Sequence, residues 1–281
     1  MKGCNNFCSY CIVTYVRGRE ASRSEAEIFA EVKRLTESGT KEIILLGQNV
    51  NSYGNGTFPA LLDRVAQING ISRLRFVTSH PKDFSTALVE IMAKHENICP
   101  FIHLPLQSGS NEVLKRMNRH YTWEHYYDNI QNAQEIIPQL RFSSDFIVGF
   151  PGETEADFEK TLEAIRTVRY ESLFAFNYSV RPGTHAEKFE DNIPSAEKSR
   201  RLDELLRLQS AISQEDHRDD PGKTIKVMVE GVSKRDEKAF SGRTVYSRSV
   251  NFLSTKPLDV GDEIEVTITE AKPNSLFGKQ S

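Results

Sequence analysis

Residues 145–158, with the sequence DFIVGFPGETEADF, contain a strand, a turn and the start of a helix in that order. The apolar run Asp145–Val148 has the length of a buried strand, and the glycines and proline that follow end the strand. Thr154 then opens a helix, because this capping residue is followed by an acidic residue three positions later and by apolar residues at helical spacing. The stretch predicts one strand–turn–helix unit.

The same alternation of strand and helix recurs on both sides of this stretch. Four further apolar runs have the length of a strand: Glu42–Leu46, Leu74–Val77, Phe101–Leu104 and Ser172–Phe176. Amphipathic segments lie between them, and Ser24 with Glu27 forms a second capping pattern. Strands that alternate with helices are joined by right-handed crossovers into a parallel sheet. We therefore expect an α/β fold that contains a partial parallel (β/α) barrel.

The pattern changes towards the C-terminus. A charged, solvent-facing helix is expected over about residues 195–217, and residues 219–222 (DDPG) form a turn. Beyond this turn, apolar residues alternate with polar ones, as in the segment 225–229, and glycines interrupt the sequence. This period of two predicts a small antiparallel β-barrel of five strands. We divide the chain into a core domain of residues 1–220 and a β-domain of residues 221–281.

The composition of the 281 residues is that of an ordinary globular protein, with 38% hydrophobic and 27% charged residues and a net charge of -3. Residues 221–281 hold ten Lys and Arg against eight Asp and Glu, so the β-domain is slightly basic. No apolar run approaches the roughly 18 residues of a membrane span, and no signal-peptide pattern is present. Four cysteines are too few for a disulfide framework. We expect a cytoplasmic protein that does not bind membranes.

Polar residues gather directly after the predicted strands. The segments are GQN (47–49), TSH (78–80), QSGS (107–110), GFPGE (149–153) and NYSVRPG (177–183). The carboxyl ends of parallel strands meet at one face of a barrel, and ligand sites on such folds lie at that face. We therefore predict a ligand site formed by these segments.

Three of the four cysteines lie within eight residues, at Cys4, Cys8 and Cys11. Thiolates at this CxxxCxxC spacing favour an iron–sulfur cluster. A cluster of four irons takes one ligand per iron, so three thiolates leave one iron open for another molecule. A structural zinc site prefers four protein ligands, and Cys99 would have to supply the fourth. Three cysteines without any metal are the remaining alternative.

The residues around these cysteines resemble a known family. GCNNFCSYCIV (3–13), YVRGRE (15–20), LPLQSGS (104–110), DFIVGFPGET (145–154) and YSVRPGTHA (178–186) are similar to the radical S-adenosylmethionine (SAM) methylthiotransferases. Residues 222–281 resemble the TRAM module of that family, an RNA-binding, OB-like β-barrel. The resemblance extends over essentially the whole chain. The residues between the cysteines favour the members that act on tRNA over those that act on a ribosomal protein.

The resemblance implies a chemistry. Cys4, Cys8 and Cys11 would hold a [4Fe–4S] cluster whose open iron binds SAM, and an electron from the cluster would cleave SAM to methionine and a 5′-deoxyadenosyl radical. The implied product carries a methylthio group at C2 of N6-dimethylallyladenosine, next to the anticodon of tRNA. The implied partners are tRNA and an electron donor. The alternatives are a methylthiotransferase for a ribosomal protein and a non-catalytic RNA-binding protein with a zinc-stapled loop.

The resemblance also implies roles for individual residues. The cofactor pocket would be formed by Gly47, Gln48, Gln107, Ser108, Gly109, Gly149, Pro151, Gly152 and Glu153. RNA phosphates would be bound by Arg17, Arg19, Arg23, Lys234, Arg235, Arg243 and Arg248. Phe240, Tyr246 and Phe252 are candidates to stack on unpaired bases.

Two features depart from the family pattern. Thr14 occupies a position where proline is usual, which we expect to loosen the cysteine loop. Only Met1–Gly3 precede that loop, so the first barrel strand is expected to be missing, together with an N-terminal domain that carries a second [4Fe–4S] cluster. From this we expect a truncated chain that retains the radical step and lacks sulfur insertion.

Overall fold

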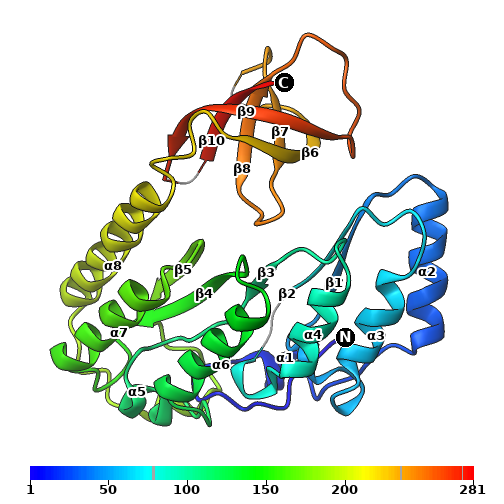
Figure 1. Cartoon of the computed structure of the whole chain (residues 1–281). Coiled ribbons are helices and arrows are strands. Elements are labelled where there is room, and N and C mark those ends of the chain that lie inside the picture. Colours follow the sequence, from blue (N-terminus) through cyan, green and yellow to red (C-terminus); the bar gives the residue numbers. More distant parts are fainter. Residues whose placement is uncertain (78–79, 235, 274) are drawn as a thin grey trace.

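The computed structural model describes residues 1–77, 80–234, 236–273 and 275–281. The N-terminal part contains parallel strands covered by helices, and the C-terminal part is a closed β-barrel (Figure 1). The long helix α8 (Ser195–Asp216) joins the two parts. None of the helices within the described ranges combines the length and hydrophobicity needed to cross a lipid bilayer. The RNA-binding role expected for Arg235 falls outside the described residues.

Five strands form the sheet region of the N-terminal part. They are β1 (Glu42–Leu46), β2 (Arg73–Val77), β3 (Phe101–His103), β4 (Arg141–Val148) and β5 (Ser172–Asn177). β1 pairs with β2, β4 lies between β3 and β5, and these pairings are parallel. A parallel bridge between Leu74 and Ile98 joins the two groups. The expected partial (β/α) barrel is confirmed.

Helices lie along one face of these strands (Figure 1). Those before α8 are α1 (Val13–Arg17), α2 (Glu25–Glu37), α3 (Phe58–Ala66), α4 (Thr86–Lys94), α5 (Asn111–Arg116), α6 (Trp123–Ile136) and α7 (Glu155–Val168), with the 3₁₀ helices η1 (Val50–Asn55), η2 (Pro81–Asp83) and η3 (His185–Lys188). The capping boxes predicted at Ser24 and Thr154 are both present. Leu62, Phe146 and Ile165 are fully buried in the core that the helices and strands share.

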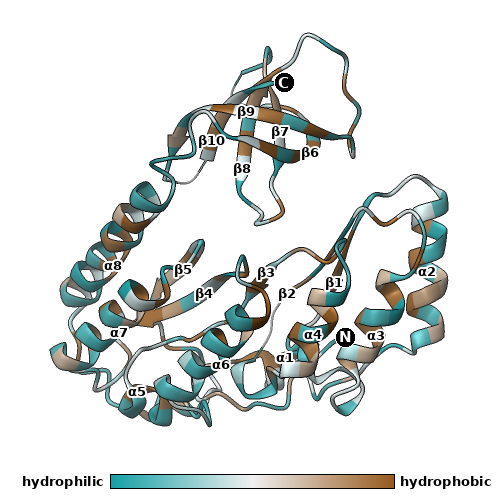
Figure 2. Ribbon diagram, viewed as in Figure 1, coloured by the Kyte–Doolittle hydropathy of each residue, from teal (hydrophilic) through white to brown (hydrophobic). Residues whose placement is uncertain are grey.

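The charged helix predicted over about residues 195–217 is α8, and one of its faces is buried. Leu205 and Ile212 lie in the main hydrophobic core, and α8 contacts both α7 and β5. Gln209 donates a hydrogen bond from Nε2 to the carbonyl oxygen of Tyr170, just before β5, at 2.8 Å. Figure 2 shows short hydrophobic stretches on this otherwise hydrophilic helix. The expectation of a solvent-facing helix therefore holds only for its outer face.

The C-terminal part is a closed barrel with the strand order β10–β8–β7–β6–β9. Its strands are β6 (Thr224–Val232), β7 (Phe240–Arg243), β8 (Ser249–Leu253), β9 (Glu263–Lys272) and β10 (Ser275–Gln280). The expected antiparallel arrangement is wrong at one pair, since β10 and β8 run parallel. An odd number of strands cannot alternate in direction all the way round a closed ring. Phe252 is fully buried in the barrel core, so it cannot stack on a base.

Two buried arginines of β2 fix the barrel to the end of the sheet at which the strands begin. Arg73 donates to the carbonyl oxygen of the last residue of β7 at 2.7 Å and forms an ion pair with Glu263 of β9. Arg75 donates to the carbonyl oxygens of residues 244–245, which follow β7, at 2.9 and 2.7 Å. It also forms an ion pair with Glu42 of β1. The barrel is therefore held by buried polar contacts to the sheet as well as by α8.

Candidate metal centre

The cysteine loop begins at the end of β1. The amino group of Met1 donates to the carbonyl oxygen of Leu46 at 2.9 Å, and the amide of Gly3 donates to Oε1 of Gln48 at 2.8 Å. Further along, the amide of Ser9 donates to the carbonyl oxygen of the residue that follows α5. The loop therefore lies across the carboxyl ends of the strands, which is the face where ligands bind on such folds.

The three cysteines of this loop are free thiols. Cys8 is buried, whereas Cys4 and Cys11 are partly exposed, and burial raises the pKa of both partly exposed thiols. The hydroxyl of Thr14 donates to the carbonyl oxygen of Cys4 at 3.0 Å. Proline has no such donor, so Thr14 ties the loop together, contrary to the loosening that we expected.

Cys99 lies at the opposite end of the parallel (β/α) barrel, where the strands begin. Its amide donates to the carbonyl oxygen of Leu74, near the start of β2, and burial raises the pKa of its thiol to about 11. This position contradicts a zinc site made from Cys99 and the cysteine loop. Within the described ranges, no group of three or more His, Cys, Asp or Glu side chains is arranged to hold one metal ion.

The donor set of the cysteine loop fits a four-iron cluster. The ligands of one zinc ion lie about 2.3 Å from a shared centre, so they must approach one another closely. The thiolates of an iron–sulfur cluster bind different irons and are spread more widely. Three free thiols in one loop supply three of the four ligands that a four-iron cluster takes, and they leave one iron open for another molecule.

A buried arginine contacts the middle cysteine. Nη1 of Arg119 lies 3.2 Å from Sγ of Cys8. Nε of the same side chain donates to the hydroxyl of Tyr121 at 2.8 Å, and Nη2 donates to the carbonyl oxygen of Pro105 at 3.0 Å. The cysteine loop is thus in contact with a cation that lies 111 positions away in the sequence.

Two other side chains near this face are buried with polar atoms that have no hydrogen-bond partner among the described residues. These atoms are both polar atoms of the Asn6 amide and Nε2 of His80. Nδ1 of His80 accepts a hydrogen bond from the amide of Lys82, and burial lowers the pKa of the ring, which is therefore neutral. Buried polar atoms without partners are rare because they destabilise the fold. A group bound at this face would supply the missing partners.

Three of the residues predicted to bind the cofactor lie at the ends of β1 and β3. A Cβ atom on Gly47 would lie 2.6 Å from the side chain of Met1, so the loop packs closely on this glycine. Gln48 holds the start of the loop, as described above. Gln107 is buried and has a φ of +76°, a strained conformation for a residue other than glycine. Such strain costs about 1–3 kcal/mol and is frequent at ligand sites.

Ser108 and Gly109, predicted to bind the cofactor, pack against α7. Oγ of Ser108 lies 3.3 Å from the hydroxyl oxygen of Thr161, and the amide of Gly109 donates to the same oxygen at 3.0 Å. A Cβ atom on Gly109 would lie 2.3 Å from the carbonyl oxygen of Lys160. The two residues therefore shape the turn after β3, and their direct contact with a cofactor remains a prediction.

The turn after β4 contains the other four predicted cofactor residues. Gly149 and Gly152 have φ angles of +69° and +77°, which favour glycine, and Pro151 is buried between them. Oε2 of Glu153 accepts the amide hydrogen of Gly149 at 2.6 Å and pairs with Arg201 at 2.8 Å. Oε1 of Glu153 is buried and has no partner. This turn is held mainly by the protein itself, and one carboxylate oxygen is left for a bound group.

The residues predicted to contact RNA differ in exposure. Arg17, Arg19, Arg23, Lys234 and Arg243 are exposed. Arg248 is only 8% exposed; its Nη2 donates to the carbonyl oxygen of Lys272 at 2.8 Å, and its Nη1 lies 3.8 Å from Glu171. Nε and Nη1 of Arg248 are buried without a hydrogen-bond partner among the described residues, and its contact with RNA phosphates stays a prediction. Arg248 links the barrel to the start of β5.

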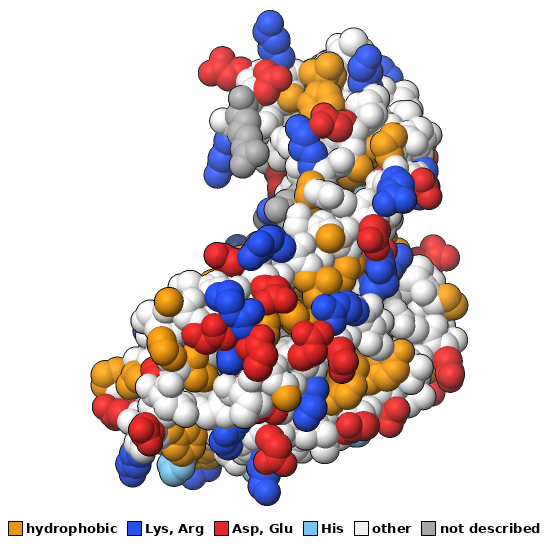
Figure 3. Space-filling view, turned by 90° about the vertical axis from the view of Figure 1, so that its left-hand side faces the viewer, with side chains coloured by type: hydrophobic (Ala, Val, Ile, Leu, Met, Phe, Trp, Pro, Cys, Tyr) orange, Lys and Arg blue, Asp and Glu red, His pale blue; other side chains and the backbone are white. Residues whose placement is uncertain are grey.

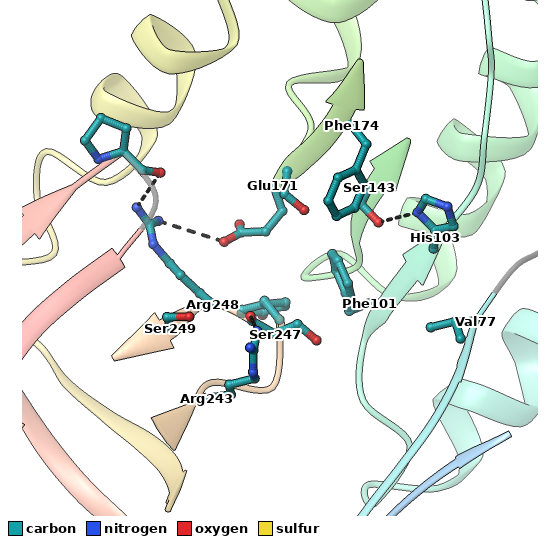
Figure 4. Close-up of a pocket in the computed structure, with 13 residues that line it drawn as sticks. Val77, Phe101, His103, Ser143, Glu171, Phe174, Arg243, Ser247, Arg248 and Ser249 are labelled. Atoms are coloured by element: carbon teal, nitrogen blue, oxygen red, sulfur yellow. Dashed lines mark hydrogen bonds and ion pairs between the residues drawn. The ribbon is translucent and has the colours of Figure 1, made fainter. Parts of the chain in front are cut away.

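A cavity of about 440 Å³ lies between the barrel and the strands of the N-terminal part (Figure 4). Phe101, His103 and Phe174 line it from β3 and β5, while Arg243 and Ser247 line it from the barrel. In Figure 4 the ring of His103 points towards Ser143 of β4, and the His103 Nδ1 to Ser143 Oγ distance is 2.9 Å. The cavity combines aromatic rings, hydroxyl groups and a cation in one place.

Two protein-family models match the chain. The Radical SAM superfamily matches residues 1–165, which include the cysteine loop and β1 to β4. The chain belongs to the radical SAM superfamily. The TRAM domain matches residues 218–280, which contain the closed barrel. The resemblance is confirmed at the level of the radical SAM superfamily and the TRAM domain.

Longer proteins named tRNA-2-methylthio-N(6)-dimethylallyladenosine synthase are similar to this radical SAM chain over its whole length. The protein from Clostridium botulinum (strain Hall) is 50% identical over 285 residues, which cover 100% of this chain and 63% of the relative. The protein from Carboxydothermus hydrogenoformans is 47% identical, covering 99% of this chain and 64% of the relative. The chain therefore spans less than two thirds of the length of these relatives.

Solved structures share the fold at low sequence identity. The radical SAM methyltransferase TsrM from Kitasatospora setae matches with a TM-score of 0.55 and 18% identity, covering 66% of this chain and 37% of that one. The cobalamin-dependent SAM radical enzyme OxsB matches with a TM-score of 0.50 and 13% identity, covering 76% and 30%. Both comparisons concern the fold alone.

Sequence analysis did not identify Asn6, Arg119 or Tyr121 as residues of this site. Asn6 lies inside the cysteine motif, and its position there was a usable signal. Arg119 and Tyr121 follow α5 in a segment without a motif, and only the fold brings them to Cys8. His80 belongs to one of the polar segments after the strands, but nothing in the sequence showed that its Nε2 would be buried without a partner.

Proposed function

We propose that this chain takes part in installing a methylthio group at C2 of N6-dimethylallyladenosine in tRNA, next to the anticodon, through radical SAM chemistry. The proposal rests on one observation. A loop with three free cysteine thiols lies at the carboxyl ends of a parallel (β/α) barrel, and this barrel is docked on a TRAM barrel. The names of the relatives supply the substrate. Because the substrate is tRNA, we assign the protein to the cytoplasm.

In this proposal Cys4, Cys8 and Cys11 would hold a [4Fe–4S] cluster, which would supply the electron for the cleavage of SAM. Gln48 holds the cysteine loop in place through the amide of Gly3, and the strained Gln107 closes the site at the end of β3. The protein residues thus position the cofactors and keep water from them.

The cavity between barrel and strands is proposed to receive a nucleoside of the RNA. Phe101, Phe174 and His103 offer rings on which a base can stack. Ser143 and Ser247 offer hydroxyl groups for hydrogen bonds to the base or ribose, and the exposed Arg243 can meet a phosphate. Because the cavity lies beside the TRAM barrel and the cysteine loop lies at the carboxyl ends of the strands, the nucleoside in the cavity would position the RNA and would not be the base that is modified.

Charge on the surface does not favour RNA binding at the face that carries α8. This face shows acidic and basic side chains interspersed (Figure 3). Many of them pair with one another: Arg200 contacts Glu155, Glu197 and Glu204, and Arg169 contacts Glu215 and Asp216. Such paired charges attract a polyanion weakly. On the TRAM barrel, Lys234 and Arg243 are exposed, and Arg243 pairs with Glu230 at 2.8 Å.

The reaction needs two further contributions. A donor of single electrons must reduce the cluster before each cleavage of SAM. Sulfur insertion needs a second cluster, and Cys99, the remaining cysteine, is a single buried thiol on the far side of the barrel. We therefore propose that a separate cysteine-containing domain supplies the second cluster.

The test is anaerobic reconstitution of the chain with iron and sulfide. We expect about four irons with matching sulfide, visible absorption typical of a cluster, and cleavage of SAM to 5′-deoxyadenosine and methionine after reduction. An anticodon stem-loop that carries the dimethylallyl group should bind more tightly than a matched stem-loop without it. A colourless protein, one zinc per chain, or reduced protein that leaves SAM intact would overturn the proposal.

A further inference from the structure

Arg119 is the most completely enclosed cation near the cysteine loop, with 4% of its surface exposed. Its three donor groups are directed to the hydroxyl of Tyr121, the carbonyl oxygen of Pro105 and the sulfur of Cys8. Tyr121 is itself held, because its hydroxyl donates to the carbonyl oxygen of Leu106 at 2.9 Å. The guanidinium group is therefore positioned by protein groups on two sides, with its third side facing Cys8.

No carboxylate is among the recorded partners of Arg119 in the described part of the chain. The other strongly buried arginines differ in this respect: Arg73, Arg75, Arg201 and Arg248 form ion pairs with Glu263, Glu42, Glu153 and Glu171. A charge that is buried without an opposite charge destabilises a fold by several kcal/mol, typically about 3–5 kcal/mol. The environment of Arg119 is thus incomplete unless an anion is present.

The phenol that Arg119 contacts does not supply that anion. Burial raises the pKa of Tyr121 to about 12, so its hydroxyl remains protonated and neutral at physiological pH. Cys8 is the group in contact with Arg119 that carries negative charge once it binds a metal, because metal-bound cysteine is a thiolate.

We propose that Arg119 is the counter-cation of the cluster held by the cysteine loop, and that it raises the reduction potential of this cluster through its contact with the Cys8 sulfur. The inference rests on the cluster of the proposed function. An external one-electron donor of low potential gives one electron to the cluster, no bond forms or breaks, and Arg119 keeps its proton. Because reduction adds one negative charge, a fixed cation at the thiolate stabilises the reduced form more than the oxidised form.

The position of Arg119 makes this effect strong. Hydrogen bonds to the sulfurs, net charge and solvent exposure are the quantities by which proteins set cluster potentials. Arg119 contributes to the first two, and its burial removes the water that would screen its charge. Arg119 is a positioning residue in this proposal, since it acts on the cluster through Cys8.

The experiment compares reconstituted wild-type protein with Arg119→Gln and Arg119→Lys in a redox titration followed by electron paramagnetic resonance. At the solution potential where half of the wild-type cluster is reduced, we expect the reduced-to-oxidised ratio of Arg119→Gln to fall about tenfold. For a one-electron couple this is a shift of about 59 mV to lower potential. Arg119→Lys keeps the charge and should fall between the two.

Arg34→Gln is the matched control, because it removes the same charge from an exposed residue of α2. In this control the reduced-to-oxidised ratio at the same solution potential should remain within twofold of wild type. An Arg119→Gln protein with a full cluster and an unchanged potential would overturn the proposal, as would an equal shift in the Arg34→Gln control.

A failure of Arg119→Gln to hold the cluster is also informative. If Arg119→Lys then loads with iron while Arg119→Gln does not, the positive charge is required, as proposed. If neither variant loads although both keep the circular dichroism spectrum of the wild type, side-chain shape rather than charge decides, and the proposal is wrong. A wild-type protein without any cluster would instead contradict the proposed function.

Discussion

Buried arginines stand at both ends of the parallel barrel, and their surroundings differ. Where the strands begin, Arg73 and Arg75 each have a carboxylate partner and carbonyl acceptors from the TRAM barrel. Where the strands end, Arg119 has a hydroxyl, a carbonyl and a thiol, and Asn6 has unpaired buried polar atoms. At the first end each of these arginines has a carboxylate, although Nη2 of Arg73 is buried without a hydrogen-bond partner among the described residues. At the second end no carboxylate of the described residues pairs with Arg119, which is the feature of a site that a bound anionic group completes.

The difference teaches which residues act in structure and which in chemistry. Both ends carry buried charge, so burial alone does not mark a functional site. The informative property is whether the protein supplies a carboxylate to each buried cation. By this criterion Arg248, expected from the sequence to contact RNA, belongs with Arg73 and Arg75 at the end where the strands begin, which we call the structural end, because it pairs with Glu171. Arg119, which the sequence did not single out, lies at the other end, beside the cysteine loop.

The largest effect is expected from removing a proposed cluster ligand. Cys8→Ser should leave the reconstituted protein with almost no iron, because two thiolates do not hold a four-iron cluster. Cys99→Ala is the matched control, since Cys99 lies at the structural end, and it should keep the iron content and absorption of wild type. Iron and sulfide analysis checks both. Equal loss of iron in the two variants would remove the distinction between the ends.

The next effect concerns the structural end. Arg75→Met removes an ion pair with Glu42 and two hydrogen bonds to the barrel, and should lower the free energy of unfolding by about 3 kcal/mol. Arg166→Met is the control, because Arg166 pairs with Glu159 at an exposed site and should change stability by less than about 0.5 kcal/mol. Urea unfolding measures both, and similar values for the two variants would argue against a structural role of β2.

A third expectation uses the pH dependence of alkylation in the metal-free protein. The pKa of Cys99 is raised to about 11, so at pH 8 its thiolate is about a hundredfold scarcer in the folded than in the unfolded chain. Alkylation of Cys99 by iodoacetamide should be slow at pH 8 and should rise about tenfold per pH unit below pH 11. Peptide mass spectrometry follows each cysteine. Fast labelling of Cys99 in folded protein at pH 8 would contradict the buried position.

The smallest expected effect concerns Gly109, which either shapes the turn after β3 or contacts the cofactor. Gly109→Ala places a Cβ atom 2.3 Å from the carbonyl oxygen of Lys160 and should destabilise the fold by about 2 kcal/mol. Gly56→Ala, at a left-handed φ of +98° with open space around it, should cost only about 1 kcal/mol of backbone strain. Thermal unfolding compares the two. If Gly109→Ala is fully stable but binds SAM poorly, Gly109 contacts the cofactor rather than shaping the turn.

Much of this fold could be predicted from short stretches of sequence. The strands at 42–46 and 172–177, the capping boxes at Ser24 and Thr154, and the closed barrel after residue 222 follow local patterns of apolar, capping and turn residues. The way in which the TRAM barrel closes could not be predicted from such local patterns. The parallel pairing of β8 with β10 follows from the number of strands in the ring and not from any one strand.

By itself, the sequence determined the order of the elements, the three neighbouring cysteines and the family, since these depend on residues close together in the chain. Only the tertiary structure decided the partners of Arg119, Arg75 and Arg248, which lie in distant segments. Local propensity acts over a few residues, whereas the partner of a buried charge depends on which strands and loops meet in space. That is why the sequence located the cysteines, and why the cation beside them became visible only in the fold.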